Sequence, residues 1–239
     1  IKIACIGNMN NMMFTACRYL RDIGYDAKLF TFEDEAEHFS PEADSYDNEF
    51  TSYVYKLPVS KVGLLTTDKR KLYKILSGYD VYIGTDIAPA LMEFMGMRLD
   101  VFVPHGSDIY SYPFTTKREK VVDKVGWLKE IFFISKMQFA GISSCRHIIF
   151  PDEYNLHFPY KNKLNTKATF YDFSLPMLYL PQYGNPANRS LFKSLEFYEV
   201  FNEIRKNNSL LVFSHARQNG INLPPNLSVH EKDPNSRLR

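Results

Sequence analysis

The sequence predicts an α/β fold, a Rossmann-like doubly wound parallel sheet with helices on both faces. Residues 1–32 run strand, turn, helix, strand, which is the start of a β-α-β unit. Residues 79–114 repeat this order, with a polar cluster directly after the second strand. Apolar runs alternate with helical spacing further along the chain. In such folds, ligands gather where the carboxyl ends of the strands meet their loops.

The first unit has a signal for each element. Ile1–Ile6 (IKIACI) is an unbroken apolar run, as expected of a strand that is buried on both faces. A turn at Gly7–Asn11 follows it. Met12–Ile23 has helical spacing and stops at Gly24, and Ala27–Phe32 is the second strand.

The next elements are shorter. The segment Glu33–Glu49 carries eight acidic residues and no lysine or arginine, which predicts a solvated loop rather than a cation site. Phe50–Tyr55 alternates as a short strand would, and Thr67–Leu76 is a basic helix that ends before Gly78.

The second unit is the centre of the chain. Tyr79–Ile83 is a strand and Ala88–Met97 is a helix that ends at Gly96. Leu99–Val103 is the next strand, and it stops at the polar run Pro104–Asp108. A His-Gly-Ser-Asp cluster directly after an apolar strand is where we expect a site.

The later part continues the alternation. Thr115–Ala140 is mainly helical, and Ser143–Phe150 is a further strand. Asn155–Leu164 is a loop or a broken helix, and residues 168–179 hold a strand-like run.

The chain is expected to divide into two domains. Residues 1–183 form the amino-terminal Rossmann-like domain. Residues 184–239 hold a linker helix and the start of an incomplete second α/β domain, with a helix at Leu191–Asn202 and a strand at Ser209–Phe213. Proline and asparagine then break the pattern.

Composition narrows the function classes. The chain has 239 residues and a net charge of +2, which gives no argument for nucleic acid as a partner. Its three cysteines are an odd number in apolar patterns, which predicts reduced thiols and a cytoplasmic location. Neither a transmembrane run nor a metal-binding spacing is present in the sequence, so no metal is expected.

Two surfaces have two interpretations each. Asn8, Asn10 and Asn11 can form the turn and cap the helix, or contact a ligand at the helix N-terminus; the two are compatible. The basic segment Lys117–Lys136 contains Trp127 and can rest on the inner face of an anionic membrane, or it is a core-facing helix with a solvated lysine face.

Three stretches together resemble a family. They are IKIACIGNMNNMMFTACRYLRDIGYDAKLF, then YDVYIGTDIAPAL with VFVPHGSDI, and finally NSLLVFSHARQ after the LPMLYLP link. In this order they resemble the amino-terminal, acceptor-side half of a GT-B glycosyltransferase, most like the retaining family-four group. The resemblance covers residues 1 to about 218.

The resemblance implies transfer of a sugar from a nucleotide-sugar to a saccharide or glycolipid acceptor, without a cofactor. It implies that His105 is the catalytic residue that faces the donor sugar. It also implies that Arg217 and Ser214 bind the donor, where an arginine would stabilise the charge of the leaving diphosphate. The acceptor side would be formed by residues of two turns, namely Gly7, Asn8, Asn10, Asn11, Gly106, Ser107 and Asp108.

The sequence departs from that family in two places. The first turn lacks paired glycines, and the pair of glutamates on the second domain is missing. We therefore expect a chain truncated before most of its donor site, or a divergent remnant.

Two alternatives remain. One is a non-catalytic Rossmann-like domain that binds a sugar or a nucleotide. The other is an NAD-dependent enzyme of the same broad fold, against which the missing G-x-G-x-x-G fingerprint argues.

Overall fold

The computed structural model describes residues 1–43, 49–61, 63–115, 125–152, 155–179, 181, 203 and 206, and gives only the backbone of 43 and 125–132. Contacts divide the chain into two units, Ile1–Pro181 and Gln182–Arg239. The second unit holds the predicted helix and strand beyond residue 184, together with Ser214 and Arg217, and these lie outside the described residues. The described fold is therefore that of the first unit. The predicted domain boundary after residue 183 stays a prediction.

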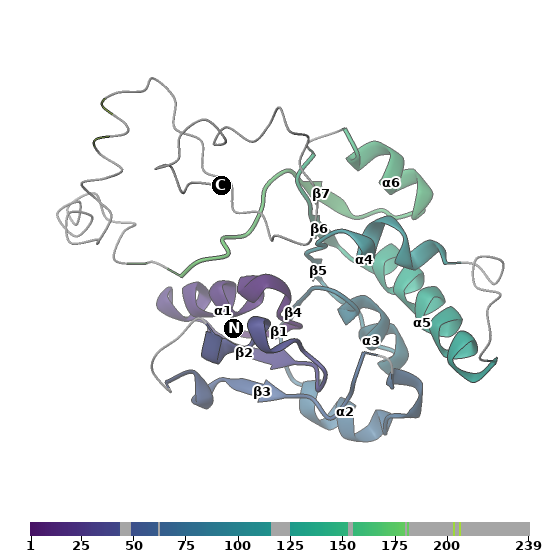
Figure 1. The fold of residues 1–239 in the computed structure, drawn as a ribbon, viewed down its shortest axis with the longest axis horizontal. Helices are drawn as coiled ribbons and strands as arrows, with labels where there is room; N and C mark the ends of the chain where they lie inside the picture. The colour runs from purple at the N-terminus through teal and green to yellow at the C-terminus, as the bar shows by residue number, and fades with distance from the viewer. Residues whose placement is uncertain are drawn as a thin grey trace, which may run out of the picture. The chain divides into compact units, whose positions relative to one another are not determined.

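Seven parallel strands form one open sheet in the order β3-β2-β1-β4-β5-β6-β7 (Figure 1). This confirms the predicted Rossmann-like α/β fold. The strands are β1 (Lys2–Ile6), β2 (Asp26–Thr31), β3 (Val54–Lys56), β4 (Val81–Gly84), β5 (Val101–Phe102), β6 (His147–Ile149) and β7 (Thr169–Tyr171).

The sheet grows in two directions from its centre. From β1 the chain steps outward to β2 and β3, then returns to place β4 on the other side of β1 and continues outward to β7. Crossover connections between parallel strands are right-handed, so the reversal of direction puts the connecting helices on opposite faces. The point of reversal lies between the carboxyl ends of β1 and β4.

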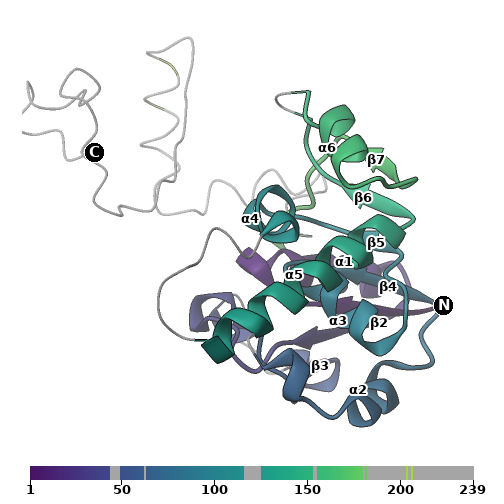
Figure 2. The same cartoon turned by 90° about the vertical axis from the view of Figure 1, so that its right-hand side faces the viewer.

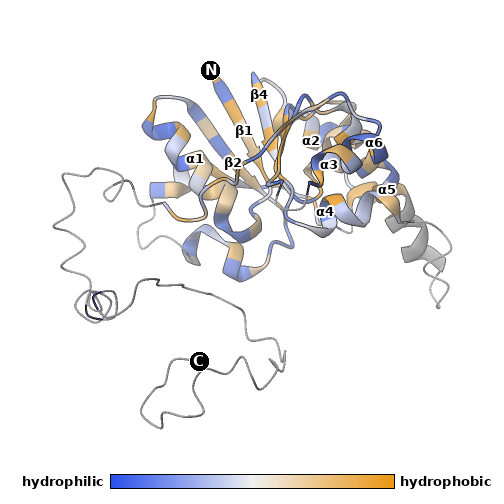
Figure 3. Ribbon diagram, turned by 90° about the horizontal axis from the view of Figure 1, so that it is seen from above, coloured by the Kyte–Doolittle hydropathy of each residue, from blue (hydrophilic) through white to orange (hydrophobic). Residues whose placement is uncertain are grey.

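The helices cover both faces of the sheet (Figure 3). Helix α1 (Met12–Asp22) packs on one face, with the η4 turn (Glu49–Ser52) beside it. The other face carries α2 (Lys69–Leu76), α3 (Ala88–Met95), α5 (Val125–Ser144) and α6 (His157–Lys163), and the short α4 (Ser107–Tyr110) follows β5. Shorter turns of 3-10 helix are η1 (Met9–Asn11), η2 (Glu37–Phe39), η3 (Pro41–Ala43), η5 (Leu64–Thr66) and η6 (Tyr112–Phe114).

Strand β1 shows why its sequence is apolar without a break. Ala4 and Ile6 join the core under α3 and α5, whereas Ile3 and Cys5 join the core under α1. Alternate side chains of a strand point to opposite faces, so a strand covered on both sides needs apolar residues at every position.

Local signals explain the helix ends. The Asp68 carboxylate accepts the backbone N–H groups of Arg70 and Lys71 and so caps α2. Gly96 takes the left-handed conformation that ends α3. Helices α3 and α5 lie side by side (Figure 2), and a Cβ on Gly141 would lie 2.2 Å from the Pro89 carbonyl oxygen, so only glycine permits this contact.

Some predicted elements differ in the structure. The predicted strand Phe50–Tyr55 is a 3-10 turn followed by β3, and β5 is shorter than Leu99–Val103. The segment predicted as a loop or broken helix forms α6. Across the described ranges, no helix combines the length and the apolar character that crossing a bilayer requires. Most of the predicted membrane segment Lys117–Lys136 has no described side chains.

Candidate functional site

The carboxyl ends of β1, β2, β4 and β5 bring four loops together at the reversal point of the sheet. In open α/β folds this crevice is where ligands bind. Gly7 follows β1, and it has a φ of +78°. A Cβ there would lie 3.0 Å from the Thr85 methyl group and 3.2 Å from the Thr85 carbonyl oxygen, so the absence of a side chain lets the two loops touch.

Asn8 is a structural residue of the first loop. It is fully buried, and its side-chain oxygen accepts the Phe14 N–H at 2.9 Å. Its amide donates to the Asn11 side-chain oxygen at 2.8 Å and to the Phe39 carbonyl. The side-chain oxygen of Asn8 therefore already accepts a backbone N–H group at the start of α1. In other folds of this kind, a bound phosphate accepts such N–H groups.

Asn10 and Asn11 both have positive φ, at 54° and 56°. Asparagine tolerates this conformation better than most residues, which accounts for the run of asparagines in the turn. Asn10 is exposed, whereas Asn11 is held by Asn8.

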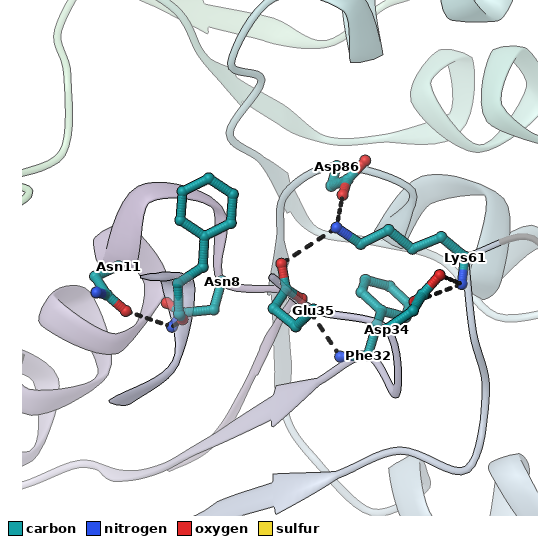
Figure 4. A network of polar contacts seen from close by, with 8 residues as sticks. Asn8, Asn11, Phe32, Asp34, Glu35, Lys61 and Asp86 are labelled. Carbon is teal, nitrogen blue, oxygen red and sulfur yellow. Dashed lines mark hydrogen bonds and ion pairs between the residues drawn. The ribbon is translucent and has the colours of Figure 1, made fainter. Parts of the chain in front are cut away.

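A lysine joins two carboxylates across the crevice (Figure 4). Lys61, from the loop after β3, lies 2.6 Å from the Asp86 carboxylate and 3.2 Å from the Glu35 carboxylate. The side chain of Glu35 is 7% exposed, so the predicted solvated loop Glu33–Glu49 is wrong at this residue.

The pKa values of Glu35 and Lys61 both depend on these neighbouring charges. Burial raises the pKa of Glu35, and the Lys61 ammonium opposes that rise without cancelling it. Burial alone would lower the pKa of Lys61, but Asp86 and Glu35 outweigh it and raise that pKa. The lysine therefore stays charged, and it links the loop after β2 to the loop after β4.

Asp108 caps the loop after β5. Its carboxylate accepts the N–H groups of His105 (3.0 Å) and Gly106 (2.8 Å), so it orders the turn in which His105 stands. Burial raises the pKa of Asp108 from 3.8 to about 6, against the effect of these hydrogen bonds. Ser107 is exposed, and Gly106 has a φ of +142°, which glycine adopts most readily.

His105 is half-buried beside this turn. Its Nε2 is buried, and no described residue forms a hydrogen bond with it. Burial lowers the pKa of His105, and the nearby Asp86 opposes this effect. At neutral pH the ring is therefore uncharged, and its Nε2 has no hydrogen-bond partner in the part of the chain that the structure describes.

A hollow of about 280 Å³ opens next to His105. Its walls come from the ends of β5 and β6, the start of α1, α4 and the segment after β7. The lining residues are Met12, Val103, Pro104, His105, Tyr110, Ile149, Phe150, Pro151, Leu156, Phe173, Ser174, Leu175 and Met177. The segment after β7 is tied to α1, where the Thr15 hydroxyl donates to the Met177 carbonyl.

The structure brings together only part of the predicted site. His105 borders the hollow, while Asn8 and Asp108 are buried and bonded to backbone groups. Sequence reasoning missed Lys61, Glu35, Asp86 and the buried Gln138. Asp86 directly follows a strand and could have been found by that signal, but Lys61 has no local signal. Within the described ranges, no cluster of three or more metal-ligating side chains occurs.

Among known proteins, only solved structures match this chain. No family model matches the chain, and no curated protein matches it. An oxidoreductase from Lactococcus lactis is 14% identical over 63% of this chain and 68% of its own, with a TM-score of 0.32. A wide-type short-chain dehydrogenase/reductase from Veillonella parvula, in complex with NADP, is 11% identical over 64% and 72%, with a TM-score of 0.31.

These findings correct the predicted family. The two matched structures are described as oxidoreductases, so the GT-B glycosyltransferase prediction is wrong. The sugar-transfer activity, the nucleotide-sugar donor and the saccharide or glycolipid acceptor are wrong with it. The physical reason is that stretches of this kind occur in parallel α/β sheets of many functions. In this chain, the polar residues Asn8 and Asp108 of these stretches accept backbone N–H groups of their own loops and helices. At such TM-scores, the two structures assign no activity to this chain.

Proposed function

We propose that the unit Ile1–Pro181 is a Rossmann-like binding domain for the nucleoside part of a nucleotide-type ligand. The observation that carries this proposal is the hollow at the carboxyl ends of β5 and β6, which the half-buried His105 lines together with aromatic and aliphatic side chains. Apolar pockets with a few polar groups at this edge of a parallel sheet are the usual ligand sites of such folds.

The lining favours a planar ring. Phe150, Phe173 and Tyr110 offer aromatic surface, and proline and aliphatic side chains form the rest of the wall. A nucleobase gains from stacking on such surface, whereas a sugar needs many more polar partners than the lining offers. The volume is just below the range of about 300–1,000 Å³ that is typical of ligand pockets, so it suits one ring system rather than a whole dinucleotide.

The charges favour a ligand with little negative charge in the site. The loops at the crevice carry three acids, Glu35, Asp86 and Asp108, and Lys61 pairs with the first two. Asn8 also occupies the helix start, where other Rossmann-like folds hold phosphate. A neutral ribose that directs hydroxyl groups toward Asp86 fits this environment better than a pyrophosphate does.

Isothermal titration calorimetry tests the proposal. The panel consists of the common ribonucleosides, their monophosphates, NADP, and free ribose as a control for the sugar alone. We expect one nucleoside to bind, its monophosphate to bind no more tightly, and ribose not to bind.

Two variants locate the binding. The substitution His105→Ala should weaken the affinity roughly tenfold, which corresponds to about 1.4 kcal/mol. The control is His147→Ala, because His147 is also half-buried with a buried, unpartnered ring nitrogen, but it lies at the first residue of β6, away from the hollow. Absence of binding by every nucleoside, or equal affinity in wild type and His105→Ala, would contradict the proposal.

A further inference from the structure

Gln138 connects the two loops that carry the candidate site. It is fully buried in the middle of α5. Its Nε2 donates to the carbonyl oxygen of Asp86 at 2.8 Å and to that of Asp108 at 3.2 Å. Its Oε1 accepts the Ala90 N–H at 3.1 Å. One carboxamide therefore fixes the loop after β4, the start of α3 and the loop after β5.

The loop after β4 needs such support. Asp86 has a φ of +56°, a left-handed conformation that costs a residue with a side chain about 1 kcal/mol. Strained residues of this kind persist when their surroundings hold them, and they cluster at binding sites. Gln138 holds the Asp86 backbone through its carbonyl oxygen, and Lys61 holds the Asp86 carboxylate.

The helix that carries Gln138 is itself firmly placed. Gly141, one turn further on, lies against the Pro89 backbone, which fixes the distance between α5 and α3. Ser135, three residues before Gln138, donates its hydroxyl to the Tyr112 carbonyl at 2.6 Å. The carboxamide is thus presented to the loops by a helix with contacts on both sides of it, rather than by a mobile segment.

We propose that Gln138 is a positioning residue of the site: it sets the Asp86 loop against the His105 loop, so that both face one ligand. This inference rests on the proposed nucleoside site, and it adds a residue that does not line the hollow. The hydrogen bonds of Gln138 go to backbone atoms of the two loops and of α3, so its effect on binding is exerted through Asp86, Asp108 and His105.

Three variants separate positioning from stability. Gln138→Met keeps the length of the side chain and removes all three hydrogen bonds. Gln138→Glu keeps an acceptor for the Ala90 N–H and removes the amide group that donates to the Asp86 and Asp108 carbonyls. This variant replaces Gln138→Met in the test if the methionine variant does not fold. Ser135→Ala is the matched control, because it removes one hydrogen bond of the same helix, to the η6 turn after α4, and leaves the hydrogen bonds of Gln138 to Asp86, Ala90 and Asp108 in place.

Two measurements are made on each variant. The first is the His105 ring signal in a ¹H–¹³C NMR spectrum, which needs no ligand. The second is the affinity for the nucleoside that wild type binds. We expect both Gln138 variants to shift the ring signal and weaken binding roughly tenfold, or about 1.4 kcal/mol. Ser135→Ala should leave the ring signal and the affinity unchanged, even if its melting temperature falls as much as that of the Gln138 variants.

The outcomes are distinguishable. An unmoved His105 signal in both Gln138 variants would overturn the positioning role, whatever the ligand does. A shifted signal in a protein for which no nucleoside binds would support positioning and contradict the proposed function. A signal that shifts equally in Ser135→Ala would also overturn the inference, because any loss of stability would then suffice.

Discussion

The Lys61 ammonium lies 2.6 Å from the Asp86 carboxylate, across the crevice between the loops after β3 and β4. The same nitrogen reaches Glu35 at 3.2 Å, so one cation holds two acids from different loops. The side chain of Lys61 is 23% exposed, and those of Glu35 and Asp86 are 7% and 16% exposed. For side chains buried to this extent, removing the cation from an ion pair destabilises the fold by more than an exposed ion pair stabilises it.

Replacing this cation should therefore destabilise the fold. Lys61→Met leaves Glu35 and Asp86 close together without compensation, and the expected loss in the free energy of unfolding is about 2 kcal/mol, below the range for fully buried pairs because Lys61 reaches solvent. Urea unfolding at pH 7 measures it. Lys56→Met on β3 is the control, since Lys56 is exposed and should change little. The deficit should shrink as the pH falls and Glu35, whose pKa burial already raises, takes up a proton. A deficit equal to that of the control would refute the bridge.

Gly7 should not tolerate a side chain. Gly7→Ala places a methyl group 3.0 Å from Thr85 and 3.3 Å from Phe32, in addition to the cost of its positive φ. Gly24→Ala isolates the second effect, because Gly24 has a φ of +93° and open space where its Cβ would stand. We expect a loss of about 1 kcal/mol for Gly24→Ala and at least about 2 kcal/mol for Gly7→Ala by urea unfolding. Equal losses would mean that the contact with Thr85 is loose.

Asp108 should make stability fall as the pH rises through the acidic range. Its pKa is raised from 3.8 to about 6 in the folded protein, so between these values the native state holds a proton that the unfolded chain has released. Stability due to the protonated form is complete below pH 4 and is lost as the pH rises through 6. The full difference is about 3 kcal/mol, at about 1.4 kcal/mol per pKa unit.

The variant Asp108→Asn tests this assignment. Its side-chain oxygen can still accept the His105 and Gly106 N–H groups, but it does not titrate. Denaturant unfolding from pH 4 to 7 should give a flatter stability profile for the variant than for wild type. Parallel profiles would show that another group is responsible.

Asn8 should be needed as an amide rather than as a polar residue in general. Asn8→Asp keeps an acceptor for the Phe14 N–H but sets an oxygen against the Asn11 side-chain oxygen and the Phe39 carbonyl. We expect a loss of about 2 kcal/mol at pH 7, as for a buried polar group left without a partner. Asn10→Asp in the same turn is exposed and serves as the control. Similar stability of the two variants, measured by thermal unfolding, would contradict the buried network.

Much of the sheet could be predicted because its signals are local. The apolar run of β1, the stop at Gly24 and the stop of α3 at Gly96 each act within a few residues. Strand β5 and helix α6 were less well predicted, because their extent depends on neighbours distant in the sequence. The turn at Gly7–Asn11 was correctly placed, and its asparagines have the positive φ values that turn chemistry favours.

The site was less predictable because it is assembled from four loops. Lys61 and Asp86 are far apart in the sequence, and neither stands in a motif. Glu35 looked like one more acid in a charged run, and only the fold buries it. The resembling motif around His105 pointed to the loop that borders the hollow, but it suggested the wrong chemistry, since a helix cap and a ligand contact can use the same residue types.

The most direct test of the proposed nucleoside site is a measurement that shows which residues the nucleoside contacts. A ¹H–¹⁵N NMR titration of the full chain with the nucleoside panel reports this residue by residue. The proposal predicts shifts concentrated at Val103, His105, Tyr110, Ile149 and Phe150, with Gly7 and Phe14 little changed. Shifts centred on Gly7, Asn8 and Phe14, as for a phosphate at the start of α1, or no shifts with any nucleoside, would contradict it.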